Sequence, residues 1–241
     1  CLEKNIPIVE LSSKSIADLL SSPLVPFQHS FFDPIDAEES ILTLIQQLRS
    51  TNADFVPVVN TADGSLVSVL GYLDVVHLLD QGAKQFPNLF IETIGEMNIG
   101  TFHNRLLTVN KNTSLYEAIS LIDAHKISGV PVVDETTGAL VSYLHKSEVN
   151  FITRANDPES FLKNLKTMTV NDVIALRMEM NNNGEPLPVT SQSLVTATLS
   201  DPIVAVFNAM MQSRVTKVMI VDKADESRCI GVVSIKDILQ Y

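Results

Sequence analysis

Apolar residues recur with helical spacing at three places along the chain. In each place they stand at i, i+3, i+4 and i+7, the stripe that an amphipathic helix buries on one side. The stripes start at Ile41, Leu115 and Ile203. Residues suited to capping a helix precede them, namely Asp36, Thr113 and the pair Ser200 and Asp201. The pattern predicts three helices that each pack one face against a core.

A β-branched run follows each stripe at a constant distance. The runs start at Val56, Val130 and Val218, in each case 15 residues after the stripe begins. Short apolar runs bounded by turn residues are typical of buried strands, and a turn before a second run predicts a hairpin. Each second strand leads to an acidic residue that opens another helix, 33, 33 and 34 residues from the start of the stripe: Asp74, Glu148 and Asp237.

A short helix-like lead-in precedes each copy, at residues 15–20, 93–97 and 169–174. The repeating unit is lead-in, strand, helix, strand, strand, helix, which predicts an α/β chain built from three tandem repeats. An insertion at residues 178–188 lengthens the third copy, and its run of asparagines before a glycine predicts an exposed loop. We divide the chain into the first lead-in and repeat, the second repeat and the third repeat, at residues 1–91, 92–167 and 168–241.

The strand motif of the second copy has the sequence Val130-Pro131-Val132-Val133-Asp134, followed by Gly138 and a strand that ends before an acidic residue. This pattern resembles the CBS domain, a β-α-β-β-α module that works in pairs. The resemblance implies an α/β (α+β) fold of three tandem CBS repeats, the last two forming a CBS pair, or Bateman module. The first copy then lacks a mate in this chain, and we expect that mate upstream of Cys1.

The order of the copies resembles the last three repeats of the gamma regulatory subunits of AMP-activated protein kinase. Two stretches carry this resemblance, residues 99–104 (Ile-Gly-Thr-Phe-His-Asn) and residues 231–239 (Gly-Val-Val-Ser-Ile-Lys-Asp-Ile-Leu). It implies a non-catalytic regulatory subunit that needs no cofactor and binds AMP, ADP or ATP between repeats. It also implies a heterotrimer with the catalytic and scaffold subunits of a kinase.

A nucleotide site between repeats needs a carboxylate for the ribose hydroxyls, a nearby hydroxyl, backbone groups for adenine and positive charge for phosphate. Asp237 and Ser234 supply the first two. The resemblance adds residues from the partner repeat, namely Thr101, Asn104, Ile127 and Ser128. The alternative is that Asp237 and Ser234 only cap the last helix, since both residue types are common caps.

The other two carboxylates are weaker candidates for a ribose site. Asp74 keeps the carboxylate, but Gly71 replaces the hydroxyl. Glu148 is longer by one methylene than the usual Asp and follows His145 rather than Ser. Displacing a carboxylate by that length weakens a close bidentate contact.

Phosphate charge is where the chain departs most from the gamma pattern. The family has His-Arg before the strand motif, whereas this chain has Asp54-Phe55 in the first copy and Thr216-Lys217 in the third. An acid and an aromatic residue cannot pair with phosphate, so we expect weak binding or a ligand with fewer phosphates than ATP. The remaining candidate cations are Lys217, Lys126, Lys146, Arg105, His103, His125 and His145.

Composition narrows the class of protein further. The formal net charge of -11, with no basic patch along the sequence, argues against nucleic acid and anionic membrane as partners. Cys1 and Cys229 have no metal-ligand spacing, and two cysteines fit a reducing compartment, cytoplasmic or also nuclear. Catalytic motifs are missing from the sequence, so we expect no enzyme. Two alternatives stay open: a CBS scaffold that binds proteins without nucleotide, and a binder of another adenosyl ligand such as S-adenosylmethionine.

Overall fold

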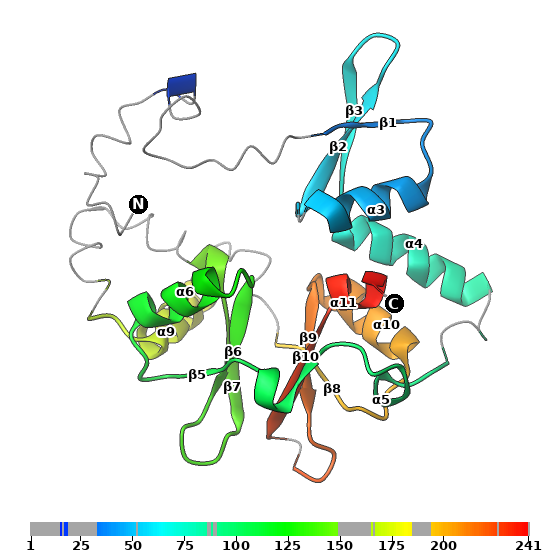
Figure 1. Ribbon diagram of the computed structural model, residues 1–241. Helices are drawn as coiled ribbons and strands as arrows, with labels where there is room; N and C mark the ends of the chain where they lie inside the picture. The colour runs from blue at the N-terminus through cyan, green and yellow to red at the C-terminus, as the bar shows by residue number, and fades with distance from the viewer. Residues whose placement is uncertain are drawn as a thin grey trace.

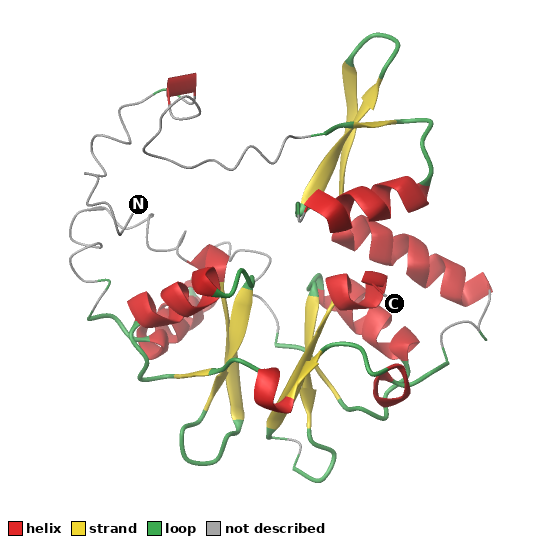
Figure 2. Ribbon diagram, viewed as in Figure 1, coloured by secondary structure: helices red, strands yellow, loops and turns green. Residues whose placement is uncertain are grey.

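The strands in the described part of the chain form three sheets, one for each predicted repeat (Figure 1). In the computed structural model the residues described are 15, 17–18, 33–51, 53–85, 88, 91–148, 165, 167–184, 194–225 and 227–240. Figure 2 shows helices on one side of each hairpin, so every sheet has a helical layer that covers its apolar face. Half of the first lead-in, residues 15–20, lies outside the described residues.

The first repeat follows the predicted order. Its elements are β1 (Ile35–Asp36), α3 (Ile41–Thr51), β2 (Phe55–Asn60), β3 (Ser65–Gly71) and α4 (Tyr72–Gln85). Strand β1 runs parallel to β2, and β2 pairs antiparallel with β3. Leu44 and Leu48 of α3 are buried, but Ile41, the predicted first position of the stripe, is 44% exposed. The buried face of α3 therefore begins one turn later than the spacing predicts.

The second and third repeats have the same architecture. The second contains β5 (Val109–Asn110), α6 (Leu115–Ala124), β6 (Gly129–Val133), β7 (Leu140–His145) and the 3-10 helix η3 (Lys146–Glu148). The third contains β8 (Thr196–Ala197), α10 (Ile203–Ser213), β9 (Lys217–Val221), β10 (Cys229–Ser234) and α11 (Ile235–Gln240). In both, the first strand is parallel to the second and the hairpin is antiparallel. The β-α-β-β-α prediction is confirmed.

The lead-ins of these two repeats exchange places. The second lead-in contains α5 (Ile94–Met97), β4 (Thr101–Phe102) and η2 (His103–Arg105), and β4 pairs antiparallel with β10 of the third repeat. The third lead-in begins α9 (Val170–Asn182), which packs into the core of the second repeat. Backbone bonds hold the exchange at both ends, from Ile94 N–H to Asp201 O at 3.0 Å and from Val170 N–H to Thr113 O at 3.0 Å.

The described residues form two hydrophobic cores. One is shared by the first and third repeats, because α4 packs beside α10 and α11 with residues such as Val75, Val76, Phe207 and Met210 all buried (Figure 1). The other belongs to the second repeat and joins α6 to α9 through Leu115, Ala118, Ile122 and Val173. The first repeat is thus held by its helices, while its strand β3 leaves Leu66, Val67 and Val69 exposed.

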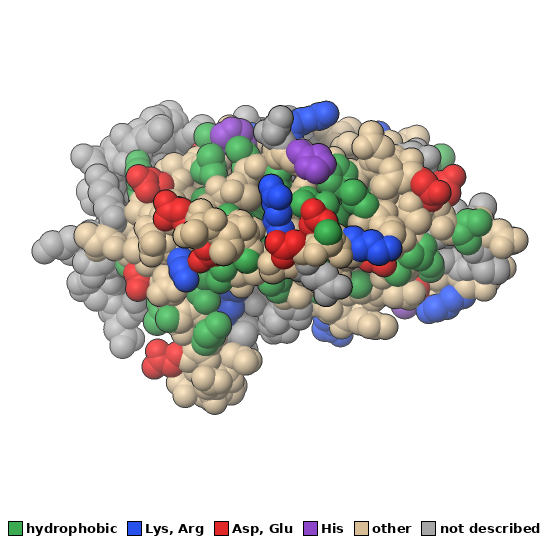
Figure 3. All heavy atoms as spheres, turned by 90° about the horizontal axis from the view of Figure 1, so that it is seen from below, with side chains coloured by type: hydrophobic (Ala, Val, Ile, Leu, Met, Phe, Trp, Pro, Cys, Tyr) green, Lys and Arg blue, Asp and Glu red, His purple; other side chains and the backbone are tan. Residues whose placement is uncertain are grey.

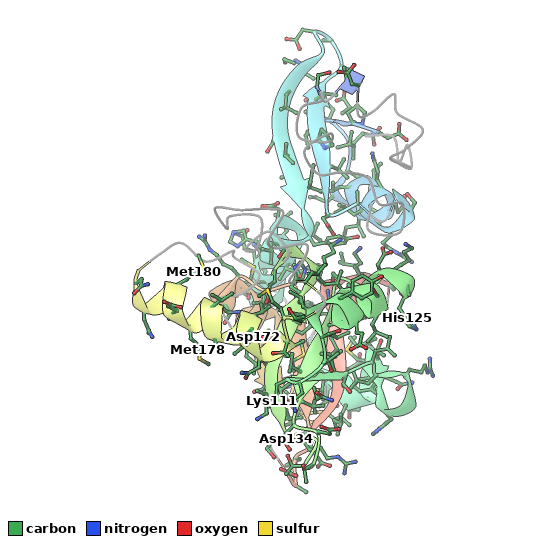
Figure 4. The ribbon with its side chains drawn as sticks, turned by 90° about the vertical axis from the view of Figure 1, so that its left-hand side faces the viewer. Lys111, His125, Asp134, Asp172, Met178 and Met180 are labelled. Atoms are coloured by element: carbon green, nitrogen blue, oxygen red, sulfur yellow. The ribbon has the colours of Figure 1, made fainter. Side chains whose placement is uncertain are left out.

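One predicted loop and the predicted caps of two helices are wrong. The segment from Met178 to Asn182, predicted as loop, forms the last turns of α9, and Figure 4 shows Met178 and Met180 on that helix. Residues 185–188 of that insertion lie outside the described residues. The cap of α6 is Ser114, in a capping box with Glu117, rather than Thr113, and Pro202 stands at the N-cap of α10 without a side-chain bond.

Charge is mixed over the surface that Figure 3 shows, with acidic, basic and apolar side chains interspersed. No helix in the described part of the chain is both long and apolar enough to cross a membrane. Within the same residues, His, Cys, Asp and Glu side chains form no group of three that could hold a metal ion.

Candidate functional site

A cavity of about 320 Å³ lies where the second and third repeats meet. Six of the predicted site residues line it: Thr101, Ile127, Ser128, Lys217, Ser234 and Asp237. They come from three separate segments, the exchanged strand β4, the turn before β6, and the β9–β10–α11 unit. The lead-in exchange explains this convergence, because it lays Thr101 directly opposite Val232 on β10.

Asp237 stands in the first turn of α11. Its Oδ2 accepts from Ser234 N–H and from Ser234 Oγ, both at 2.7 Å, so the capping interpretation holds for this oxygen. Among the described residues, Ser234 is the only hydrogen-bond partner of this carboxylate. Asp237 lines the cavity, and its Oδ1 has no hydrogen-bond partner among those residues. Capping and ligand binding are therefore compatible, since each uses a different oxygen.

The turn between α6 and β6 lines the cavity with residues 126–129. Lys126 has φ of 53°, in the left-handed region that non-glycine residues seldom adopt. Ser128 O then accepts from Lys146 N–H at 2.8 Å, which ties the turn to the end of β7. Gly129 follows, where a Cβ would lie 2.3 Å from Leu144 O, so the chain passes too close for any larger residue. Such strained, tightly packed turns are common at ligand sites.

Five basic side chains line the same cavity: Arg105, Lys126, Lys146, Lys217 and Lys236. Lys217 donates a hydrogen bond to Ser128 Oγ, which bridges the third repeat to the second. Burial lowers the pKa of Lys217 to about 8, and the positive charge of the nearby Lys236 contributes to this shift. The negative charges of Asp237 and Asp54 act in the opposite direction. Lys236 lies over the ring of Tyr72, 5.2 Å from its centroid, and burial also lowers its pKa. The cluster suits an anionic ligand.

The first repeat contributes Asp54 to this cavity. This residue precedes β2, and its Oδ2 lies 3.8 Å from Lys146 Nζ. Three repeats thus meet around one cavity, with the acidic group of the first facing the basic groups of the other two.

The other two predicted carboxylates lie elsewhere. Asp74 is exposed at the start of α4, and its Oδ2 accepts from Gly71 N–H at 2.7 Å. Glu148 is buried, with 1% of its surface exposed, and both its oxygens lie 2.6 Å from Arg177 Nη2. Burial raises the pKa of Glu148, and Arg177 opposes that shift. A carboxylate held by an internal arginine has no oxygen left for a ribose.

Asn104 and the three candidate histidines are the remaining predicted residues of the site. Asn104 belongs to η2, but the structure does not describe its side chain. His103 is exposed and does not line the cavity. Figure 4 shows His125 at the C-terminal end of α6, where Nδ1 lies 3.0 Å from Leu121 O. Burial lowers the pKa of His145 to about 4, with Lys217 and Lys146 acting in the same direction. His145 is therefore neutral at pH 7 and gives phosphate no charge.

Sequence reasoning missed three polar or charged residues of the cavity, Asp54, Lys236 and Gln240. Lys236 could have been found, because it stands between Ser234 and Asp237 in the motif itself. Asp54 was recognised only as a residue unable to bind phosphate. Its position in the cavity depends on how the first repeat packs against the pair, which no local pattern encodes.

Residues 99–149 and 188–241 match the CBS domain family. The chain therefore contains CBS domains. Its described residues form three tandem repeats of the same fold, and the matched segments fall in the last two, which form a CBS pair. Thr101, the turn at Ile127 and Ser128, and the Ser234–Asp237 motif all fall inside the two matched segments.

The CBS protein is similar to kinase gamma subunits. It is 26% identical over 188 residues to the 5'-AMP-activated protein kinase subunit gamma of Dictyostelium discoideum, covering 77% of this chain and 30% of that protein. It is 19% identical over 216 residues to the SNF1-related protein kinase regulatory subunit gamma-1 of Arabidopsis thaliana, covering 88% of this chain and 50% of that protein. The chain thus spans half or less of the length of these two relatives.

A solved structure from Methanocaldococcus jannaschii, described as an archaeal homologue of the same gamma subunit, superposes with a TM-score of 0.66. The sequence identity is 15%, and the match covers 97% of this chain and 80% of the archaeal one. At that identity the match supports the fold. It extends over all three repeats and therefore includes the first one.

Proposed function

We propose that this CBS protein is a regulatory subunit that binds an adenine nucleotide between its second and third repeats and regulates a protein kinase of the AMP-activated type. The observation that carries the proposal is the convergence of Thr101, Ser128 and Asp237 on one cavity. The carboxylate with one unbonded oxygen, the turn that lines the cavity and the cation cluster suit ribose, adenine and phosphate in turn.

In this proposal Asp237 accepts the two ribose hydroxyls with Oδ1, while Oδ2 keeps its bonds to Ser234. Backbone groups of residues 126–128 meet the adenine edge, and Lys217 and its basic neighbours meet the phosphate. The chain has no catalytic step to perform. A nucleotide that binds one arrangement of the repeats more tightly shifts the equilibrium between arrangements, and the kinase responds to that shift.

The similarity to kinase gamma subunits supports a protein kinase as the partner. We propose that the catalytic and scaffold subunits of such a kinase assemble with this chain in the cytoplasm. Asp74 and Glu148 have no part in the proposed site, because one lacks a hydroxyl neighbour and the other holds Arg177. We also propose the sequence divisions 1–91, 92–167 and 168–241 as repeat units, with the lead-ins of the last two exchanged in space.

Calorimetric titration of the whole chain with AMP, ADP, ATP and S-adenosylmethionine tests the proposal. Asp237→Ala should raise the Kd for the preferred ligand by about tenfold or more, since two hydrogen bonds to a charged group are lost. The matched control is Asp74→Ala, which removes the same type of capping contact at the start of another helix. Its Kd should stay unchanged.

Loss of a cap alone lowers stability by about 1 kcal/mol. If Asp237→Ala lowers the melting temperature but leaves the Kd unaltered, the carboxylate is only a cap. The chain is then better explained as a CBS scaffold that binds proteins without nucleotide.

A further inference from the structure

The first repeat places a fixed negative charge in the cavity that the proposed function assigns to an adenosyl ligand. Asp54 lines that cavity, and its Oδ2 lies 3.8 Å from Lys146 Nζ. Its charge also reaches other basic groups, because it opposes the lowering of the pKa of both Lys217 and Lys236. Asp54 therefore faces the same ammonium groups that a phosphate would use.

The ion pair between Asp54 and Lys146 contributes little to folding. The two side chains are 63% and 53% exposed, and exposed ion pairs stabilise a fold only weakly. Packing of the first repeat against the third depends instead on the buried core between α4 and α10. The charge of Asp54 therefore matters little for folding stability, and its main effect is on what binds in the cavity.

Charge counting indicates which ligand fits. Five basic and two acidic side chains line the cavity, an excess of three positive charges when all are ionised. AMP carries about two negative charges and ATP about four, so ATP leaves the filled cavity with net negative charge while AMP does not. The volume of about 320 Å³ is also near the lower end for ligand pockets, about 300 to 1,000 Å³.

We infer that Asp54 is a specificity-determining residue, which occupies the basic cluster as an internal anion and makes the cavity prefer an adenosyl ligand with one phosphate over one with three. A bulkier polyphosphate must compete with the Asp54 carboxylate for Lys146 and its neighbours. This inference rests on the proposed nucleotide site and adds to it the charge class of the ligand. It also gives the first repeat a direct part in ligand choice.

The test is calorimetric titration of the whole chain with adenosine, AMP and ATP, comparing wild type with Asp54→Asn. Asp54→Asn should lower the Kd for ATP about fivefold and that for AMP about twofold, with adenosine unchanged because it carries no charge. The decrease in the Kd for ATP caused by Asp54→Asn should be smaller at high salt, because ions screen exposed charges. Glu38→Gln is the matched control, since it removes an exposed charge from the same repeat at a residue that does not line the cavity.

An unchanged ratio of the ATP and AMP dissociation constants in Asp54→Asn overturns the inference while leaving the nucleotide site intact. The same shift in Glu38→Gln also overturns it, because net charge rather than position would then be responsible. If wild type and Asp54→Asn bind none of the three ligands, the proposed function fails and the inference fails with it. Equal melting temperatures of the three proteins establish that all results refer to the folded chain.

Discussion

Lys217 begins β9 with its ammonium group at the cavity wall, bonded to Ser128 Oγ. Because its pKa is lowered to about 8, the group is charged at pH 7 and loses its proton as the pH rises through 8. A bound phosphate favours the charged form. The charge state of this one side chain should therefore make ligand binding depend on pH in a range where phosphate itself is fully ionised.

We expect the Kd for AMP to rise about fivefold between pH 7 and pH 9, since most of the Lys217 charge is lost over that interval. Adenosine should bind equally at both values. Lys217→Gln should bind AMP more weakly at pH 7 and show a flat profile, measured by titration in buffers matched for ionic strength. If the Kd for AMP depends on pH as steeply in Lys217→Gln as in wild type, another group is responsible for the pH dependence.

Glu148 stands at the position in the second repeat that Asp237 has in the third, but it pairs with an internal arginine instead of lining the cavity. It is buried and paired with Arg177, whose side chain is 15% exposed. Removing one partner of a buried ion pair leaves an uncompensated charge, which costs about 3 to 5 kcal/mol. We expect Arg177→Ala to lower the free energy of unfolding by that amount at pH 7, measured by urea denaturation.

The loss in Arg177→Ala should be smaller at pH 5. Burial raises the pKa of Glu148, so without Arg177 the carboxyl group takes up a proton as the pH falls and no longer buries a charge. The double variant Arg177→Met with Glu148→Leu is the control, because it replaces both charges with apolar groups and should recover most of the stability. An equal loss at both pH values would contradict a buried unpaired carboxylate.

At the scale of elements, the pairing of β4 with β10 brings Thr101 to the cavity. The two strands approach closely because β10 has Gly231, where a Cβ would lie 2.2 Å from Phe102 Cδ1. Gly100 adds a φ of 115°, which L side chains rarely adopt. These two glycines allow the exchanged lead-in to pair with β10 as the edge strand of the third sheet.

Gly231→Ala should push β4 away from β10 and weaken AMP binding by about tenfold, because Thr101 moves with Phe102. Replacing Phe102 as well, in Gly231→Ala with Phe102→Ala, removes the clash and should restore part of the affinity. Titration calorimetry of both variants measures this. If Gly231→Ala binds AMP as well as wild type does, β4 does not position the site.

The elements themselves were predictable because each leaves a local signal. The stripe Ile203, Val206, Phe207 and Met210 is buried as its spacing predicts, and the runs at Val56, Val130 and Val218 are strands. The capping boxes at Thr93 and Glu96 and at Thr169 and Asp172 also have a sequence pattern typical of a helix start, Ser/Thr-x-x-Glu/Asp. The end of α9 was not, since its last turns contain asparagines that favour loops and only the structure shows the helix continuing.

The partners of the elements were not predictable in the same way. Sequence order places each lead-in with the repeat that follows it, whereas β4 pairs with a strand more than 100 residues later. Asp54 and Glu148 show the same difficulty at the site, since one reaches the cavity and the other turns inward to Arg177 because of contacts between distant segments. Spacing identifies a carboxylate at the start of a helix, but packing decides what it faces.

Across the whole molecule, the two hydrophobic cores predict two units of stability that do not follow the repeat boundaries. The first and third repeats share one core, and the second repeat with α9 forms the other. Elements that share a buried core open together, so hydrogen exchange should follow the cores rather than the order of the repeats along the chain.

Met210→Ala and Ile122→Ala test this as a matched pair, because both side chains are buried, at 0% and 2% exposed, in different cores. Each should cost about 2 to 5 kcal/mol through the cavity it leaves. In Met210→Ala, exchange should accelerate in both α4 and α10, although these helices belong to different repeats, while α6 stays protected. In Ile122→Ala, α6 and α9 should lose protection while α4 keeps it. If Met210→Ala leaves α4 as protected as in wild type, the first repeat folds independently of the third. The first repeat would then not keep Asp54 in a fixed position at the cavity.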